Sequence, residues 1–247
     1  MRTKRQSGAS QPPTAGKNAP AAASFRLLEV GSVAKFRIQF TKYGDMKYVS
    51  HLDMIRLFTR MFHRAELPVA YSNGFNPHPK MSVLLPLSVG FESSCEYLDA
   101  EFEKSVSMLE CLKKLKSAAP LGMEIPQICE LNETSRKAKE IRYASYDITT
   151  DAKIDADKLE RFLERETVEI VKKTKRSEGV ADIRPDIMDL CRKEEHSFSA
   201  VISAGSNANL KPDLLIEAMK TYIEEFRPQT VSICRTGILT ERGEPMM

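Results

Sequence analysis

The sequence predicts an α+β fold made of two tandem units, each with the order strand, helix, strand, strand, helix, strand. Three observations support this prediction: short segments alternate apolar with polar residues, longer segments carry an apolar stripe at helical spacing, and the same order recurs after a polar stretch at residues 131–141. This order is that of the ferredoxin-like fold, in which two helices cover one face of a four-stranded antiparallel sheet. The predicted divisions are a disordered basic tail (1–33), a first unit (34–130), a linker (131–141), a second unit (142–240) and a C-terminal tail (241–247).

The composition is that of a globular protein and excludes several kinds of site. Of the 247 residues, 42% are hydrophobic and 29% are charged. No apolar run approaches the ~18 residues that a membrane span requires. The five cysteines are widely spaced and form no CxxC pair, which excludes the usual zinc ribbon and closely spaced iron–sulfur motifs. We therefore expect a cytoplasmic protein with free thiols and no membrane association.

Positive charge is concentrated in the N-terminal tail. Residues 1–24 hold four cations and no acid, so the formal charge of +3 for the whole chain leaves −1 for the remainder. The tail is also rich in Ala, Pro, Ser and Gly, a composition that buries too little apolar surface to offset the entropy of ordering. Any nucleic-acid surface on the folded part is therefore expected to be a local patch.

The first unit begins with an alternating strand at residues 35–42 and continues into a helix expected over residues 50–65. Ser50 is a candidate N-cap, and Asp53 three residues later favours the positive end of the helix. The helix is expected to end before Pro68. The positions expected to face the core are Leu52, Ile55, Phe58, Met61, Phe62 and Ala65.

The remaining elements are predicted from the same two patterns: apolar–polar alternation for strands and an apolar stripe at helical spacing for helices. In the first unit we expect strands at residues 81–89 and 97–102, paired through a turn at Gly90, Ser93 and Ser94, then a helix from Ser105 and a strand at 123–128. In the second unit we expect strands at residues 142–149, 167–173, 197–203 and 230–235, and helices at 156–164 and 212–225.

One face of the first helix carries four potential cations. Arg56, Arg60, His63 and Arg64 fall at positions i, i+4, i+7 and i+8, which share one side of a helix. Such a ridge suits bidentate contacts to phosphates, and the alternative is an ordinary solvated helix face. A second basic run, at residues 172–176, is either a nucleic-acid contact or a set of lysines that protects an exposed strand edge.

The loop at residues 71–80 combines turn formers with an aromatic ring, an imidazole and a lysine. Pro77 and Pro79 restrict the backbone on both sides of His78, so the loop is expected to hold one shape. Rigid loops on a scaffold are common binding elements. The predicted binding residues of the first helix and this loop are Arg56, Arg60, Arg64, Ser72, Asn73, Phe75, Asn76, His78 and Lys80.

Candidate catalytic residues come from a loose constellation, because the sequence contains no P-loop, GxGxxG, HExxH or serine-elbow motif. The candidates are His51, Asp53 and His78. If the loop folds over the helix N-terminus, both imidazoles could face an anion bound there. They could also form an acid–base pair for RNA cleavage, or bind a metal with Asp53, although the spacing is not diagnostic and we assign no metal. The alternative without function is that His51 caps its helix and His78 supports the loop.

Several segments resemble, in this order, those of a known family: Phe36–Phe40, Ser50-His51-Leu52-Asp53, Arg64-Ala65-Glu66-Leu67-Pro68, Ser72-Asn73-Gly74-Phe75-Asn76-Pro77-His78-Pro79-Lys80 and Glu96-Tyr97-Leu98-Asp99. The chain resembles the radical-SAM-associated domain of bacteria, a family of unknown function. Its members occur free-standing, near a radical SAM gene, or fused to a radical SAM protein. The resemblance implies a radical SAM protein as partner. S-adenosylmethionine and an iron–sulfur cluster are then expected in that partner and no cofactor in this chain, which lacks the cysteine cluster.

The expected function is that of an accessory protein that works with a radical SAM enzyme and binds or presents an RNA substrate, either tRNA or ribosomal RNA. The partner comes from the resemblance, and the RNA comes from the ferredoxin-like architecture and the arginine stripe. One alternative is a small RNA-processing nuclease that uses His51 and His78. Another is a protein-interaction module whose loop binds the radical SAM subunit. In the leading interpretation the chain has no catalytic activity alone.

Overall fold

The computed structural model describes residues 33–103, 106–173 and 178–247. The predicted disordered tail, residues 1–33, lies outside the described residues apart from Val33. Within the described ranges, no helix is both long enough and apolar enough to cross a membrane.

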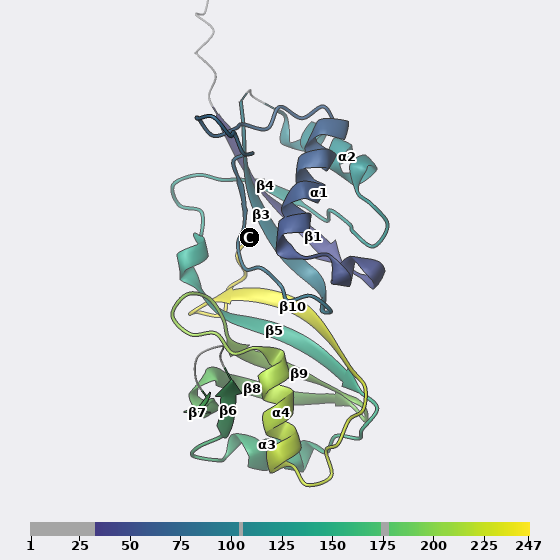
Figure 1. The fold of residues 1–247 in the computed structure, drawn as a ribbon, viewed down its shortest axis with the longest axis vertical. Coiled ribbons are helices and arrows are strands. Elements are labelled where there is room, and N and C mark those ends of the chain that lie inside the picture. Colours follow the sequence, from purple (N-terminus) through teal and green to yellow (C-terminus); the bar gives the residue numbers. More distant parts are fainter. Residues whose placement is uncertain (1–32, 104–105, 174–177) are drawn as a thin grey trace, which may run out of the picture. The chain divides into compact units, whose positions relative to one another are not determined.

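The first half of the fold has the predicted order of elements (Figure 1). Its strands and helices are β1 (Ala34–Lys42), a 3-10 helix η1 (Gly44–Tyr48), α1 (His51–Arg64), β2 (Met81–Val83), β3 (Glu92–Phe102), α2 (Met108–Ala118) and β4 (Ile128–Glu130). The strands lie in the order β4-β1-β3-β2, and every neighbouring pair is antiparallel. This arrangement of a βαββαβ chain is ferredoxin-like.

The second half repeats this arrangement. Its elements are η2 (Ala138–Glu140), β5 (Ile141–Thr150), α3 (Ala156–Leu163), β6 (Glu169–Lys173), β7 (Glu178–Asp182), η3 (Arg184–Asp186), β8 (Ile187–Glu194), β9 (Ser197–Ser203), α4 (Pro212–Tyr222) and β10 (Val231–Thr240). The antiparallel order β10-β5-β9-β8 is again fourth, first, third, second. The predicted α+β fold is therefore confirmed, and both halves have the strand order expected of a ferredoxin-like unit.

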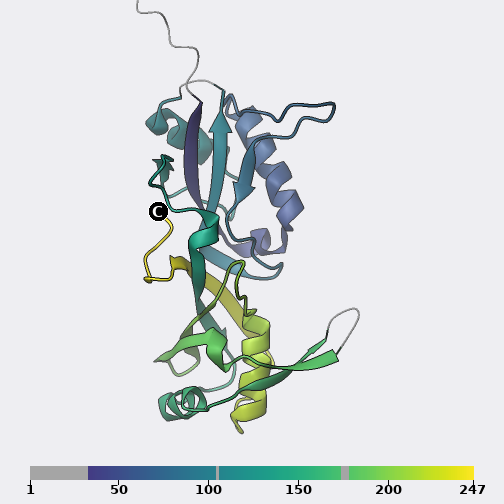
Figure 2. The same cartoon turned by 90° about the vertical axis from the view of Figure 1, so that its left-hand side faces the viewer.

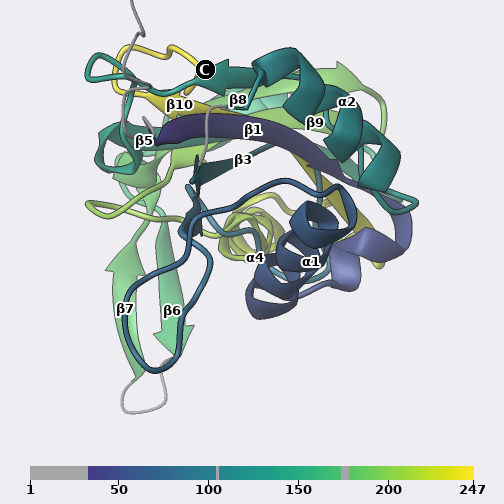
Figure 3. The same ribbon diagram turned by 90° about the horizontal axis from the view of Figure 1, so that it is seen from above.

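The second strand of the second half was assigned wrongly from the sequence. The predicted strand at 167–173 corresponds to β6, which pairs only with β7 in a separate two-stranded sheet (Figure 3). The second strand of the main sheet is β8, for which no strand was predicted. Only Ile187 and Leu190 of β8 are buried, because β8 is an edge strand, so the apolar alternation that marks a strand is weak there.

Three boundaries in the first half also differ from the prediction. β2 ends at Val83, three residues before Pro86, although we expected a strand to residue 89. β3 begins at Glu92 and includes the two serines that were interpreted as a turn. The last strand is β4 and not residues 123–128, where Pro126 has no N–H to donate to a ladder.

Helices α1 and α2 pack on the same face of the first half through a core rich in phenylalanine. Phe40 of β1 meets Phe58 of α1 edge to face, with ring centroids 5.0 Å apart. Leu52, which was predicted to face this core, is instead exposed at the first turn of α1. Met54 is buried instead, four residues before Phe58, so the core stripe begins two positions later than expected.

The two halves share one eight-stranded sheet, a junction that the sequence did not predict. β10 of the second half pairs with β3 of the first in parallel, through Cys234 opposite Glu92 and Arg235 opposite Ser93. Ser93 strengthens this junction, because its hydroxyl donates to the Arg235 carbonyl at 3.1 Å.

The last residues of the chain pack against β1. Arg37 is 1% exposed and binds both oxygens of Asp99, at 2.7 and 2.8 Å. Its third hydrogen bond, at 2.6 Å, goes to the backbone carbonyl of Met246, which is itself buried. The residues after β10 are therefore held by a buried arginine of the first strand.

We predict that Gly122→Ala lowers the free energy of unfolding by about 3 kcal/mol, because Gly122 has φ +82° and an added Cβ would lie 2.5 Å from the Tyr43 carbonyl oxygen. Gly90→Ala is the matched control, since Gly90 also has positive φ (+93°) but no atom within 4 Å of an added Cβ. It should cost only the conformational strain, about 1 kcal/mol. Urea denaturation of both variants measures the difference, and equal losses would contradict the close approach of residue 122 to the end of β1.

Candidate functional site

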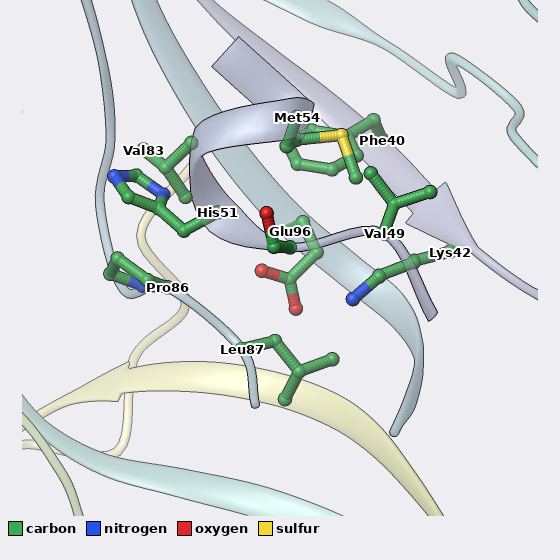
Figure 4. Close-up of a pocket in the computed structure, with 10 residues that line it drawn as sticks. Phe40, Lys42, Val49, His51, Met54, Val83, Pro86, Leu87 and Glu96 are labelled. Carbon is green, nitrogen blue, oxygen red and sulfur yellow. The ribbon is translucent and has the colours of Figure 1, made fainter. Parts of the chain in front are cut away.

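A small pocket lies where β1 ends and α1 begins (Figure 4). The space inside it that water-sized spheres can occupy is about 20 Å³. Its walls are largely apolar and come from Phe40, Val49, Met54, Val83, Pro86 and Leu87. Its polar groups come from Lys42, Ser50, His51 and Glu96.

Lys42 and Glu96 lie on the helix-covered face of the sheet although both are charged. Residues two apart on a strand share a face, and Lys42 follows Phe36, Ile38 and Phe40 at this interval. On β3, Glu96 stands in the same relation to the buried residues Leu98, Ala100 and Phe102. The exposed fractions of Lys42 and Glu96 are only 3% and 2%. The strand period therefore places two charges at the end of an apolar core.

Arg235 of β10 neutralises Glu96. Its Nε donates to Glu96 Oε1 at 2.8 Å, and its Nη2 contacts both carboxylate oxygens, at 2.6 Å for Oε1. The same Nη2 donates to the Leu85 carbonyl at 2.6 Å. Because both side chains are about 2% exposed, this is a bidentate, charge-assisted pair away from water.

Lys42 has no comparable partner. Within residues 33–103, 106–173 and 178–247, its Nζ makes neither a hydrogen bond nor an ion pair. Burial lowers the pKa of Lys42 from the ordinary value of 10.5; the Glu96 carboxylate opposes this shift and the Arg235 guanidinium adds to it. The pocket is thus lined by the buried residues Lys42 and Glu96, and the buried Arg235 binds Glu96 from outside the lining.

The first turn of α1 forms the wall of the pocket beside Lys42. Ser50 is the N-cap, as predicted, and its Oγ accepts from the Asp53 N–H at 3.3 Å and donates to Asp53 Oδ2 at 2.7 Å. The Ser50 hydroxyl, and then Arg56, hold the pKa of Asp53 below its ordinary range. Asp53 is therefore part of the cap, and His51 lines the pocket at the start of the helix.

The loop at residues 71–80 lies at the opposite end of the first half. The Ala70 N–H donates to the Glu101 carbonyl at 2.8 Å, and the Lys80 N–H donates to the Ala70 carbonyl at 2.7 Å. Glu101 is paired with Lys35, at the beginning of β1. The loop therefore begins and ends beside the first residues of β1.

His51 and His78 are not brought together. His51 follows Lys42 at the end of β1, whereas His78 belongs to the loop at its beginning, and the 9 residues of β1 span about 26 Å. The expected fold of the loop over the helix N-terminus is wrong, and with it the shared anion site and the acid–base pair. No group of three or more His, Cys, Asp or Glu side chains with metal-binding geometry occurs in the part of the chain that the structure describes.

The loop itself is a hairpin with an exposed tip. Tyr71 pairs with Pro79, the Ser72 N–H donates to the His78 carbonyl at 2.8 Å, and the His78 N–H donates to Ser72 Oγ at 3.0 Å. Phe75 at the tip is fully exposed. The loop extends beyond the body of the first half as the blue hairpin in Figure 2. The other predicted binding residues of the loop, Asn73, Asn76, His78 and Lys80, are exposed.

The predicted arginine stripe is exposed on α1, but two of its members have intramolecular partners. Arg56 forms an ion pair with Asp53 at 2.8 Å, and Arg64 donates to the Ala118 carbonyl at the end of α2. Arg60 has no ion-pair partner among the described residues. The neighbouring helix α2 contributes three more cations. We define the basic face as Arg56, Arg60, Arg64, Lys113, Lys114 and Lys116.

The second basic run lies largely outside what can be described. Lys175 and Arg176 belong to residues 174–177, outside the described residues. Lys172 and Lys173 end β6, which pairs only with β7. Both interpretations of this run stay predictions.

Lys42, Glu96 and Arg235 were missed as site residues. For Lys42 and Glu96 a signal was present, because a charge that continues an apolar period-two series is directed to the core face of its strand. Arg235 gave no such signal, since its partner Glu96 is 139 residues away in sequence.

Comparison with known proteins identifies the family. Residues 35–212 match the family described as "Uncharacterized protein conserved in bacteria (DUF2344)". The chain belongs to this family. The match runs from β1 to the first residue of α4, so Lys42 and Glu96 fall inside it and Arg235 falls outside. The predicted bacterial domain of unknown function is confirmed.

Other comparisons place the DUF2344 chain at a distance from characterised proteins. No curated protein matches it. Among solved structures, it is similar to a chain of the "Crystal Structure of a Cbf5-Nop10-Gar1 Complex", with 11% sequence identity and a TM-score of 0.41. The alignment covers 82% of this chain and 48% of that one, so the chain spans about half the length of that relative.

We predict that Lys42→Met raises the free energy of unfolding at pH 7, in phosphate-free buffer, by about 1 kcal/mol or more, because it removes a buried charge without a partner. The pKa of Lys42 in the folded protein lies below the ordinary 10.5, so between these two values the unfolded state binds more protons. Wild-type stability from this group therefore rises with pH across that window. The advantage of Lys42→Met should shrink accordingly.

Urea denaturation of the wild type and of Lys42→Met between pH 7 and about 10.5 tests this linkage. The control is Lys139→Met, which removes an exposed lysine and should show no pH-dependent advantage. A Lys42→Met variant less stable than the wild type at pH 7 would show that the protein itself compensates the ammonium.

Proposed function

We propose that this protein is an accessory protein that binds an RNA substrate on the basic face of its first half and presents it to a radical SAM enzyme. The observation that carries the proposal is the excess of cations on α1 and α2. The six cations of the basic face stand against three acids on the same helices and the turn after α1, namely Asp53, Glu66 and Glu110. A local positive patch on a part of the chain that is nearly neutral overall suits the phosphate backbone of RNA.

The free members of this face are the expected phosphate contacts. Arg60 and Lys113 are exposed, and neither has an ion-pair partner in the described ranges. Lys114 is paired with Glu110 at 3.0 Å and Arg56 with Asp53, and such exposed pairs are weak enough to exchange for phosphates. Arg64 positions the end of α2 through Ala118 and is assigned a structural part.

The radical SAM partner rests on the family resemblance of the sequence segments described above. In this proposal, the partner holds S-adenosylmethionine and its iron–sulfur cluster, and this chain supplies substrate binding. The substrate class is tRNA or ribosomal RNA.

We predict that Arg60→Ala with Lys113→Ala weakens binding of tRNA and ribosomal RNA fragments uniformly. The slope of log K against log salt should fall by about 1 for each lost phosphate contact. Filter binding at several salt concentrations measures both quantities. The matched control is Lys220→Ala on α4, which removes a half-buried, ion-paired cation of the second half and should leave both unchanged. An RNA affinity that changes neither with the salt concentration nor on the double substitution would contradict the proposal.

The exposed tip of the loop favours a second role, as the contact with the radical SAM subunit. A fully exposed phenylalanine on a hairpin held by Ser72 and His78 is a suitable anchor for a protein partner, because aromatic residues dominate interface energetics.

We predict that Phe75→Ala releases the co-purifying radical SAM subunit while RNA affinity and stability stay at the wild-type level, since Phe75 buries nothing in this chain. Co-purification from cells that express both proteins is the measurement. The control is Tyr48→Ala, another exposed aromatic, located at the opposite end of the first half. Loss of RNA binding with retention of the subunit would instead assign Phe75 to base stacking.

A further inference from the structure

We propose that the pocket at the N-terminus of α1 is a binding site for an oxyanion, the phosphate or carboxylate group of a small ligand or of a chain end. The anion would be held by Lys42 Nζ, by the free backbone N–H groups of the first turn of α1, and by His51 at the mouth. This site is distinct from the basic face and does not depend on the RNA proposal.

The first reason is the charge balance inside the pocket. Two buried cations, Lys42 and Arg235, face one buried carboxylate, and both oxygens of Glu96 are taken by Arg235. Lys42 as a residue is only 3% exposed, and its Nζ makes no hydrogen bond or ion pair with a described residue. A buried charge without a partner is costly, and a bound anion removes that cost.

The second reason is the direction of the groups. Figure 4 shows the Lys42 nitrogen directed into the space between the start of α1 and the Glu96 carboxylate. The 14-residue α1 presents its positive end to the same space, and its first N–H groups have no acceptor beyond the Ser50 cap. An ammonium and a helix N-terminus that converge on one point form an anion site.

The two neighbouring carboxylates, Glu96 and Asp53, do not cancel the positive potential that Lys42 and the helix N-terminus create in the pocket. Glu96 is neutralised as a unit by the bidentate Arg235. Asp53 is turned toward the Ser50 hydroxyl and Arg56, at 2.7 and 2.8 Å. The net local charge of the pocket is therefore positive.

The size and lining of the pocket define what fits. The enclosed space has room for water-sized spheres of only about 20 Å³, so a terminal oxyanion group enters from the open mouth and a whole nucleotide does not. Apolar walls from Phe40, Met54 and Leu87 keep water from screening the ammonium. The shared ligand chemistry is a terminal oxyanion, which free phosphate, a small carboxylic acid or the 5′-phosphate of an RNA can supply.

The test is isothermal titration calorimetry of the full chain with inorganic phosphate, at constant ionic strength. The wild type should bind phosphate, and Lys42→Met should bind it about tenfold or more weakly, because it removes a charge-assisted contact. Lys139→Met is the matched control and should bind like the wild type. Phosphate affinity that is absent in the wild type, or equal in the wild type and Lys42→Met, overturns the proposal.

Further arms of the experiment distinguish the sources of the oxyanion. Acetate in place of phosphate tests a carboxylate ligand. A short RNA with a 5′-phosphate, compared with the same RNA ending in a 5′-hydroxyl, tests a chain end; a preference that Lys42→Met abolishes assigns the site to RNA termini. If the two RNAs bind alike while Lys42→Met still loses phosphate, the site takes a free small anion. The Arg60 and Lys113 substitutions should leave phosphate binding unchanged. Phosphate binding therefore tests the pocket independently of RNA binding on the basic face.

A second readout covers the case in which Lys42→Met does not fold. Acetylation of the wild-type protein by an amine-reactive reagent, followed by mass spectrometry of the Lys42 peptide, reports the accessibility of the amine. Saturating phosphate should protect Lys42 and leave Lys139 equally modified. Equal modification of Lys42 with and without phosphate overturns the proposal.

Discussion

The buried ion pair between Glu96 and Arg235 is the interaction on which the rest of the structure depends. It joins β3 to β10 at a junction where two residue pairs of the described strands connect the halves of the sheet. It also engages both oxygens of the carboxylate that lines the pocket. Lys42 Nζ makes no hydrogen bond or ion pair with a described residue. The ion pair that joins the two halves of the sheet therefore also shapes the electrostatics of the pocket.

The fold was predictable where its signals are local. The Ser50 cap, the apolar face of α1 and the alternation of β1 lie within single elements, and each was found from the sequence. β8 was missed because an edge strand with two buried residues has little apolar alternation. The β3–β10 junction was missed because two residue pairs between distant strands have no sequence signature.

The candidate site was predicted less well, for a geometrical reason. His51 and His78 were grouped because they are close in sequence, but a strand and a helix of the first half separate them. The residues that do meet are Lys42, which carries a detectable period-two signal, and Glu96 with Arg235, which come from distant strands. Closeness in sequence thus favoured the pair His51 and His78, which the fold does not bring together. The strand face shared by Lys42 and the buried residues of β1 would have indicated Lys42.

The most direct test of the central claim is a crystal structure of the protein grown with tungstate, whose anomalous scattering locates the anion without ambiguity. We predict tungstate in the pocket, about 3 Å from Lys42 Nζ and beside the first turn of α1, with Glu96 still bound to Arg235. A structure without tungstate at this place, in which Lys42 Nζ instead donates directly to the Glu96 carboxylate, would contradict it.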